Sequence, residues 1–173
     1  ALRIADDYLA RVIAGEEYLV FDGAMGTMLQ AAGLEAGELP ELLCLNSPDE
    51  VTAIHRQYVE AGSLAVTTNT FGANARKLGD AASVREIFTA AVACVRNAGA
   101  RYVVADIGPT GALLAPLGTM SFDEAYDLFA EQVRAAVEAG ADIILIETMA
   151  DLLETKAAVL AAKECSDLPV FAT

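Results

Sequence analysis

Polar side chains follow the apolar runs of this sequence directly, and their types suit the binding of a small ligand. The clearest of them are Asp22, Gly23, Thr67, Thr68 and Glu147. A carboxylate at the end of an apolar run needs a cation, a metal or several hydrogen-bond donors. Two carboxylates at one place would suit an ammonium group. Asp22 could equally cap the turn that it begins, whereas a functional role is favoured for Glu147.

Small residues accompany these acids. Gly23 lets a backbone approach a ligand closely or form a tight turn. Thr67 and Thr68 supply hydroxyl groups that could orient a small molecule. The segment 108–111, Gly-Pro-Thr-Gly, follows another apolar run and is read chiefly as a turn, although its N–H groups could bind an anion.

Histidine and cysteine usage argues against a metal site built by this chain. His55 is the only histidine, and its place within a predicted helix favours a surface or half-buried position. Cys44, Cys94 and Cys165 are odd in number and widely spaced, so neither a disulfide framework nor a zinc pair is expected. We therefore predict no metal ligand in the chain, and no residue that is catalytic by itself.

The charge balance excludes two classes of partner. Eleven basic residues face 25 acidic ones, giving a net charge of −14 in 173 residues. A nucleic acid or an anionic membrane would be repelled overall. No apolar run has the length of a membrane span, and the acidic N-terminal stretch does not match a signal peptide. A cytoplasmic location is the resulting expectation.

Strand-like and helix-like segments alternate along the chain. Strands are expected at residues 18–21, 64–68, 102–107, 142–146 and 169–173, and helices at residues 48–61, 84–97, 122–139 and 152–164. Ser47 and Ser121 are predicted to cap helices, the latter in a capping box with Glu124. Three of the strands follow a helix end and an Ala-Gly turn, which is typical of parallel βα units.

Two architectures fit five parallel strands: an open doubly wound sheet or the first part of a (β/α)8 barrel, which needs about 250 residues. We favour the barrel, since the sequence ends within its fifth strand. In a barrel the carboxyl ends of the strands open on one face, where active sites lie. Asp22, Thr68 and Glu147 should therefore surround one mouth.

Five segments resemble one enzyme family in the right order. They are FDGAMGTMLQ (21–30), PELLCLNSPDEVTAIHRQYVEAG (40–62), TNTFGANARKL (68–78), IGPTGALLAPLG (107–118) and IETMADLLETKAAVLAAKE (146–164). They resemble the homocysteine S-methyltransferases, and most of all the homocysteine-binding domain of cobalamin-dependent methionine synthases. The resemblance implies a (β/α)8 TIM barrel, of which residues 1–173 would be a homocysteine-binding domain truncated on its C-terminal side.

The resemblance also implies a chemistry. Zinc would activate the homocysteine thiol, which accepts a methyl group from a corrinoid, methyltetrahydrofolate or a related donor to give methionine. Carried over by motif, Asp22 and Gly23 would contact the amino acid end of homocysteine. Thr68 would line the pocket with Thr67 beside it, and Glu147 would accept the ammonium group.

One departure limits that reading. The family's zinc ligands are cysteines in an Asn-Cys and a Gly-Gly-Cys-Cys segment, and neither segment occurs in this sequence. The chain alone is therefore expected to lack zinc and activity. A half-barrel would also expose apolar surface, so the chain is expected to be poorly stable alone, or to pair with a second copy or with the missing barrel half. Two alternatives stay open: a non-catalytic binding or assembly module, and another barrel enzyme acting on a small amino acid or oxoacid. A Schiff-base lysine at a strand end would favour the latter, and none is present.

Overall fold

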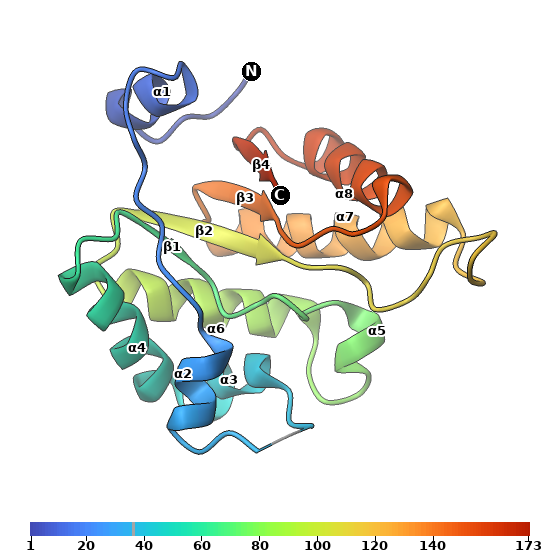
Figure 1. The fold of residues 1–173 in the computed structure, drawn as a ribbon, viewed down its shortest axis with the longest axis horizontal. Helices are drawn as coiled ribbons and strands as arrows, with labels where there is room; N and C mark the ends of the chain where they lie inside the picture. Colours follow the sequence, from blue (N-terminus) through green and yellow to red (C-terminus); the bar gives the residue numbers. More distant parts are fainter. Residues whose placement is uncertain (36) are drawn as a thin grey trace.

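The computed structural model describes residues 1–35 and 37–173 and contains one parallel sheet of four strands (Figure 1). The strands are β1 (Ala65–Thr67), β2 (Tyr102–Ile107), β3 (Ile143–Ile146) and β4 (Val170–Ala172). They lie in the order β1-β2-β3-β4. A doubly wound sheet reverses its strand order, whereas a barrel does not. The uninterrupted order therefore supports the partial barrel.

Helices connect the strands. They are α1 (Asp7–Ile13), α2 (Gly26–Ala31), η1 (Pro40–Leu42), α3 (Leu43–Asn46), α4 (Pro48–Glu60), α5 (Ala75–Leu78), α6 (Val84–Asn97), α7 (Phe122–Ala139) and α8 (Leu152–Cys165). The predicted capping box at Ser121 and Glu124 is confirmed. The side chain of Ser47 makes no capping hydrogen bond, so that detail of the prediction is wrong. Gly140 ends α7 with φ 92°, in the left-handed region.

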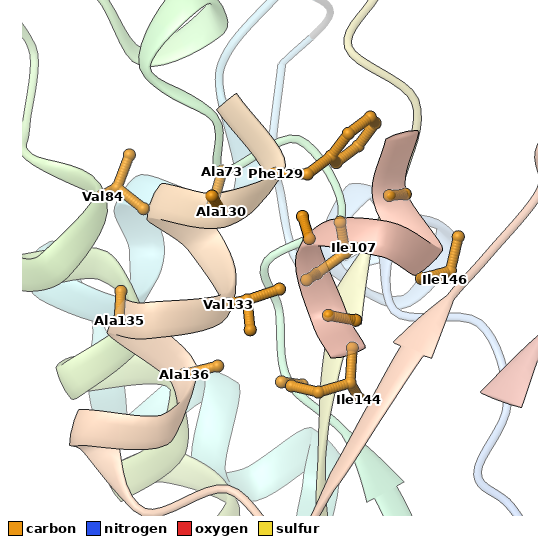
Figure 2. Close-up of a cluster of buried hydrophobic side chains, with 14 of the residues drawn as sticks. Ala73, Val84, Ile107, Phe129, Ala130, Val133, Ala135, Ala136, Ile144 and Ile146 are labelled. Carbon is orange, nitrogen blue, oxygen red and sulfur yellow. The ribbon is translucent and has the colours of Figure 1, made fainter. Parts of the chain in front are cut away.

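The outer face of the sheet carries the larger core. Strand side chains alternate between faces, and Ile107, Ile144 and Ile146 point toward α7 and α8, as Figure 2 shows. Phe129 and Val133 of α7 meet them there. Small alanines on α7 and α8 let these two helices approach each other and the sheet closely. This core fixes the strands whose ends carry the polar residues.

The inner face has a smaller apolar cluster and a polar end. Tyr102 and Val104 of β2 pack with Ile143 and Leu145 of β3, and Leu9 of α1 covers them. The same alternation puts Asp106 on this inner face, two residues beyond Val104. The apolar cluster therefore supports the amino end of the strands, and the carboxyl end is left to polar groups.

The predicted first strand, residues 18–21, is reduced to a single parallel bridge between Phe21 and Ala65. Hydrogen bonds from Leu64 N and Ala65 N to Val20 O hold the segment beside β1. Tyr18 is 89% exposed, so the segment has little packing on its other side within the described residues. The prediction of a regular strand there is wrong, but the chain still delivers Asp22 to the carboxyl end of β1.

His55 in α4 is completely buried, which corrects the expected surface or half-buried position. Neither ring nitrogen has a hydrogen-bond partner within the described residues. Burial lowers the pKa of His55 to about 4, so the ring is neutral in the folded protein at pH 7. The helical periodicity of the sequence indicates which face of α4 carries His55, but the residues that enclose this face come from elsewhere in the chain.

Acidification is expected to destabilise the fold through His55. The unfolded chain takes up a proton near pH 6.5 and the folded chain only near pH 4, so stability falls as pH drops through this window. Between pH 7 and pH 5 the loss should be about 2 kcal/mol. Urea unfolding at both pH values gives this loss of unfolding free energy for the wild type and for His55→Phe. The difference between the two proteins removes the contributions of all other titrating groups. An equal pH dependence of the two proteins would contradict this assignment.

Apolar side chains also lie on the surface. Leu152, Leu153 and Leu160 of α8 are exposed, and exposed apolar area favours association. Pairing with a second copy or with further barrel strands stays a prediction. Among the described helices, none has both the length and the apolar composition to cross a membrane.

Candidate functional site

A cavity of about 730 Å³ opens at the carboxyl ends of the strands. The five predicted site residues all line it: Asp22, Gly23, Thr67, Thr68 and Glu147. The expected convergence on one mouth is therefore confirmed as geometry, while contact of these residues with a ligand stays a prediction. The volume of the cavity falls in the range of sites that bind small molecules. The wall also includes Glu41, Asn69, Thr70, Phe71, Asp106, Leu145 and Phe171.

Asp22 is held by Thr67. The backbone N–H of Thr67 lies 3.1 and 3.0 Å from the two carboxylate oxygens of Asp22, and the Thr67 hydroxyl lies 3.1 Å from each. Both groups donate to the carboxylate. Burial nevertheless raises the pKa of Asp22 to about 6, against the lowering effect of these donors. Asp22 is thus a partly desolvated carboxylate in a fixed orientation, and Thr67 serves as its support.

Thr68 and Thr70 form a closed chain of hydrogen bonds with the backbone of Asp106. The Asp106 N–H donates to Thr68 Oγ1 at 3.1 Å, and Thr70 Oγ1 donates to the Asp106 carbonyl at 2.7 Å. The two hydroxyls lie 2.6 Å apart. Since the Thr70 proton is used on the carbonyl, Thr68 is the donor between them. The hydroxyl of Thr68 is therefore occupied inside the wall, and its methyl group is what remains for a ligand.

Glu147 stands directly after β3, where its backbone N–H donates to the carbonyl of Ile107 at 3.0 Å. The next residue, Thr148, has φ 57°, an uncommon conformation for a β-branched residue. Such conformations persist where the surrounding structure enforces them, and they concentrate at functional sites. The turn at Thr148 thus supports the functional reading of Glu147.

Gly23 has a packing reason for lacking a side chain. A Cβ at this position would lie 2.9 Å from Cε1 of Tyr58. The Tyr58 hydroxyl donates to the carbonyl of Ala24 at 2.8 Å and so secures the same loop. The loop between the first bridge and α2 is held against α4, with its backbone facing the cavity.

Asp106 is the site residue that the sequence reasoning missed. It lies within an apolar strand and is only 6% exposed. Burial and the nearby negative charge of Glu147 raise its pKa to about 8. An acid inside an otherwise apolar run, in phase with the inward positions of β2, was the available sign. The predicted site residues lie at or after strand ends, whereas Asp106 lies inside the span of β2.

The Gly-Pro-Thr-Gly turn has a structural role. Both the N–H and the hydroxyl of Thr110 donate to Oε1 of the buried Glu154, at 2.8 and 2.6 Å. This ties the turn after β2 to α8. With the Thr110 N–H occupied by Glu154, an anion site there gains no support.

The residues in hand do not fit a metal centre. Within residues 1–35 and 37–173, no group of three His, Cys, Asp or Glu side chains could hold a metal ion. Cys44 and Cys94 are buried, and their thiols contact the backbone carbonyls of Asn69 and Pro48.

Comparison with known proteins agrees with this geometry. The family model described as homocysteine S-methyltransferase matches residues 19–173. The chain belongs to the homocysteine S-methyltransferase family. It is 37% identical over 182 residues to the methionine synthase of Mycobacterium tuberculosis (strain ATCC 25618 / H37Rv), covering 92% of this chain. It is 35% identical over 178 residues to that of Mycobacterium leprae (strain TN), covering 90%. The chain spans 15% of the length of each of these relatives.

Solved structures support the fold of this family member. The homocysteine methyltransferase MmuM from Escherichia coli matches with a TM-score of 0.78 in its metallated form, at 22% identity. The match covers 92% of this chain and 64% of that one. Its oxidised form matches with a TM-score of 0.83 at 20% identity, covering 97% and 65%. The predicted α/β-barrel segment of a homocysteine methyltransferase is thus confirmed as a fold.

Proposed function

We propose that the protein methylates homocysteine and that this chain forms the pocket for the amino acid. The observation that carries the proposal is the convergence of Asp22 and Glu147 on one cavity in a member of this family. Leu145 and Phe171 add apolar side chains to the lining of the same cavity. Homocysteine has a matching division into an ammonium end and a two-carbon arm that ends in a thiol.

Each lining residue has a role in this proposal. Glu147 accepts the ammonium group, and Asp22 contacts the same end of the ligand. Gly23 lets the ligand approach the backbone of its loop. Thr67 orients Asp22 through the four contacts described above, and Thr68 contributes its methyl group to the wall.

Thiol activation and methyl donation are proposed for the whole protein. Zinc bound by residues other than those described would lower the pKa of the thiol, as metal coordination does in general. The sulfur then forms the new bond to the methyl group while the bond between methyl and donor breaks. The proposed donors are a methylated corrinoid or methyltetrahydrofolate, bound by other domains.

Removal of the Glu147 charge is the direct test. In the whole protein, Glu147→Gln should lower kcat/KM for homocysteine about 100-fold or more, because the ammonium loses its charged partner in a desolvated site. Steady-state methionine formation measures this. The matched control is Glu60→Gln, at an exposed position at the end of α4, which should retain wild-type rates. Unchanged kinetics of Glu147→Gln would refute the assignment.

The alternatives gain less support. A Schiff-base enzyme needs a lysine at the ligand, and no lysine lines the described cavity. Lys77, on α5, directs its ammonium to the carbonyl of Pro109 at 2.9 Å. A non-catalytic binding module would differ by measurement: calorimetry would detect homocysteine binding by the whole protein, while methyl transfer would be absent with every donor.

A further inference from the structure

Asp106 has no partner for its charge in the described chain. Its side chain lines the cavity, and Oδ1 is fully buried without a hydrogen bond. Structural aspartates normally accept hydrogen bonds from N–H or hydroxyl groups, as Asp22 does from Thr67. A buried carboxyl without donors leaves room for a cation or for a proton.

The backbone at Asp106 is fixed, so this acid cannot turn away from the cavity. Thr68 and Thr70 clamp its N–H and its carbonyl on one side. On its other side, Asp106 pairs in register with Leu145 of β3, the strand that Glu147 directly follows. The fold thus holds in the pocket wall a carboxyl group that lies beside the Glu147 carboxylate and whose Oδ1 has no hydrogen-bond donor among the described residues.

Among the described residues, the charged groups that act most strongly on Asp106 are acidic. They are the carboxylates of Glu147 after β3, Asp22 before β1 and Glu41 in η1. Burial, these charges and a side-chain hydrogen bond with Glu147 raise the pKa of Asp106 to about 8, so the group holds a proton in the empty pocket at pH 7. A ligand ammonium group would reverse this preference, because opposite charge favours the ionised carboxyl.

We propose that Asp106 is a further ligand-binding residue, which contacts the ammonium group together with Glu147 and gives up its proton to solvent when that group binds. The inference rests on the proposed function for the identity of the ligand. It predicts that the pocket distinguishes amino acids from their deaminated analogues, and that this selectivity is proton-linked. Below pH 8 the cost of ionising Asp106 weakens binding of the ammonium ligand, and the cost falls as pH rises.

The test compares two ligands in the whole protein. L-Homocysteine and 4-mercaptobutanoate share a thiol and a carboxylate, but only homocysteine has an ammonium group. The ratio of their dissociation constants cancels the contributions of thiol and metal. In the wild type, selectivity for homocysteine should rise at least tenfold between pH 6 and pH 8. In Asp106→Asn it should stay flat, with selectivity near the wild-type value at pH 6 and at least tenfold lower at pH 8.

The outcomes separate the two proposals. If the ratio of dissociation constants does not change with pH in the wild type, the inference is overturned without any variant. It is also overturned if selectivity still rises with pH in Asp106→Asn, because the rise would then come from Asp22. If the wild type binds homocysteine but the ratio behaves in either of these ways, the proposed function stands and only the inference fails. Absence of homocysteine binding by the wild type overturns both.

Discussion

Asp106→Asn is expected to be more stable than the wild type, by an amount that grows with pH. The folded-state pKa of Asp106, about 8, lies above the ordinary value of 3.8. An acid whose pKa is raised by folding contributes stability that is present below its pKa in the unfolded chain. This stability is lost as pH rises through its pKa in the folded chain. Asparagine does not titrate, so the variant escapes this loss. Between pH 5 and pH 8 its advantage should increase by about 4 kcal/mol.

Chemical denaturation of both proteins at several pH values measures this advantage. The matched control is Asp80→Asn, at an exposed position after α5, for which no pH-dependent difference from the wild type is expected. An advantage of Asp106→Asn that does not change with pH would show that the carboxyl is already satisfied. A gain in stability together with loss of ammonium selectivity would identify Asp106 as a residue kept for binding at the expense of the fold.

Gly108→Ala is expected to destabilise the protein by about 3 kcal/mol or more. A Cβ on Gly108 would lie 2.6 Å from both the carbonyl oxygen and ring carbon Cε2 of Phe71. The backbone cannot yield easily, because the Gly108 N–H donates to that same carbonyl at 3.0 Å. Phe71 lines the cavity, so its displacement should also weaken ligand binding. Thermal or urea unfolding gives the first effect and titration with homocysteine the second.

Gly26→Ala is the control for that substitution. A Cβ on Gly26 would meet no atom of the described residues within 4 Å, and this glycine begins α2 without a left-handed φ. Alanine there should be neutral or stabilising by about 0.5 kcal/mol, since it restricts the unfolded chain. Equal destabilisation by the two alanine variants would mean that the close approach of Gly108 to Phe71 does not govern stability.

Local patterns in the sequence were sufficient for the regular elements. The helices α6 and α7 begin and end where the pattern predicts, and strand β2 has its predicted bounds. Helix capping, hydrophobic periodicity and glycine turns depend on residues close together in the sequence, so they can be predicted from one sequence alone. The polar residues after the strands were found for a similar reason, because a parallel sheet sends all such positions to one edge.

Contacts between segments that lie far apart in the sequence could be identified only from the tertiary structure. The sequence could not tell that Thr67 would hold Asp22, or that Thr68 would hold the backbone of Asp106, because these contacts span 45 and 38 residues. The burial of His55 and the reduction of the predicted strand at residues 18–21 to a single bridge were missed for the same reason. The spacing of residues in the sequence indicates which of them share a face of a helix or strand, but only the packing decides which residues cover that face.

The sequence by itself therefore determined the family, the parallel βα order and the identity of the five residues around the mouth. Only the folded chain decided which of their groups remain free for a ligand. The hydroxyl of Thr67 donates to the carboxylate of Asp22, and that of Thr68 is used by the backbone of β2 and by Thr70. Among the described residues, Oδ1 of Asp106 has no hydrogen-bond partner. The physical reason is that hydrogen-bond satisfaction depends on which atoms meet in space, and strand pairing sets that across long stretches of chain.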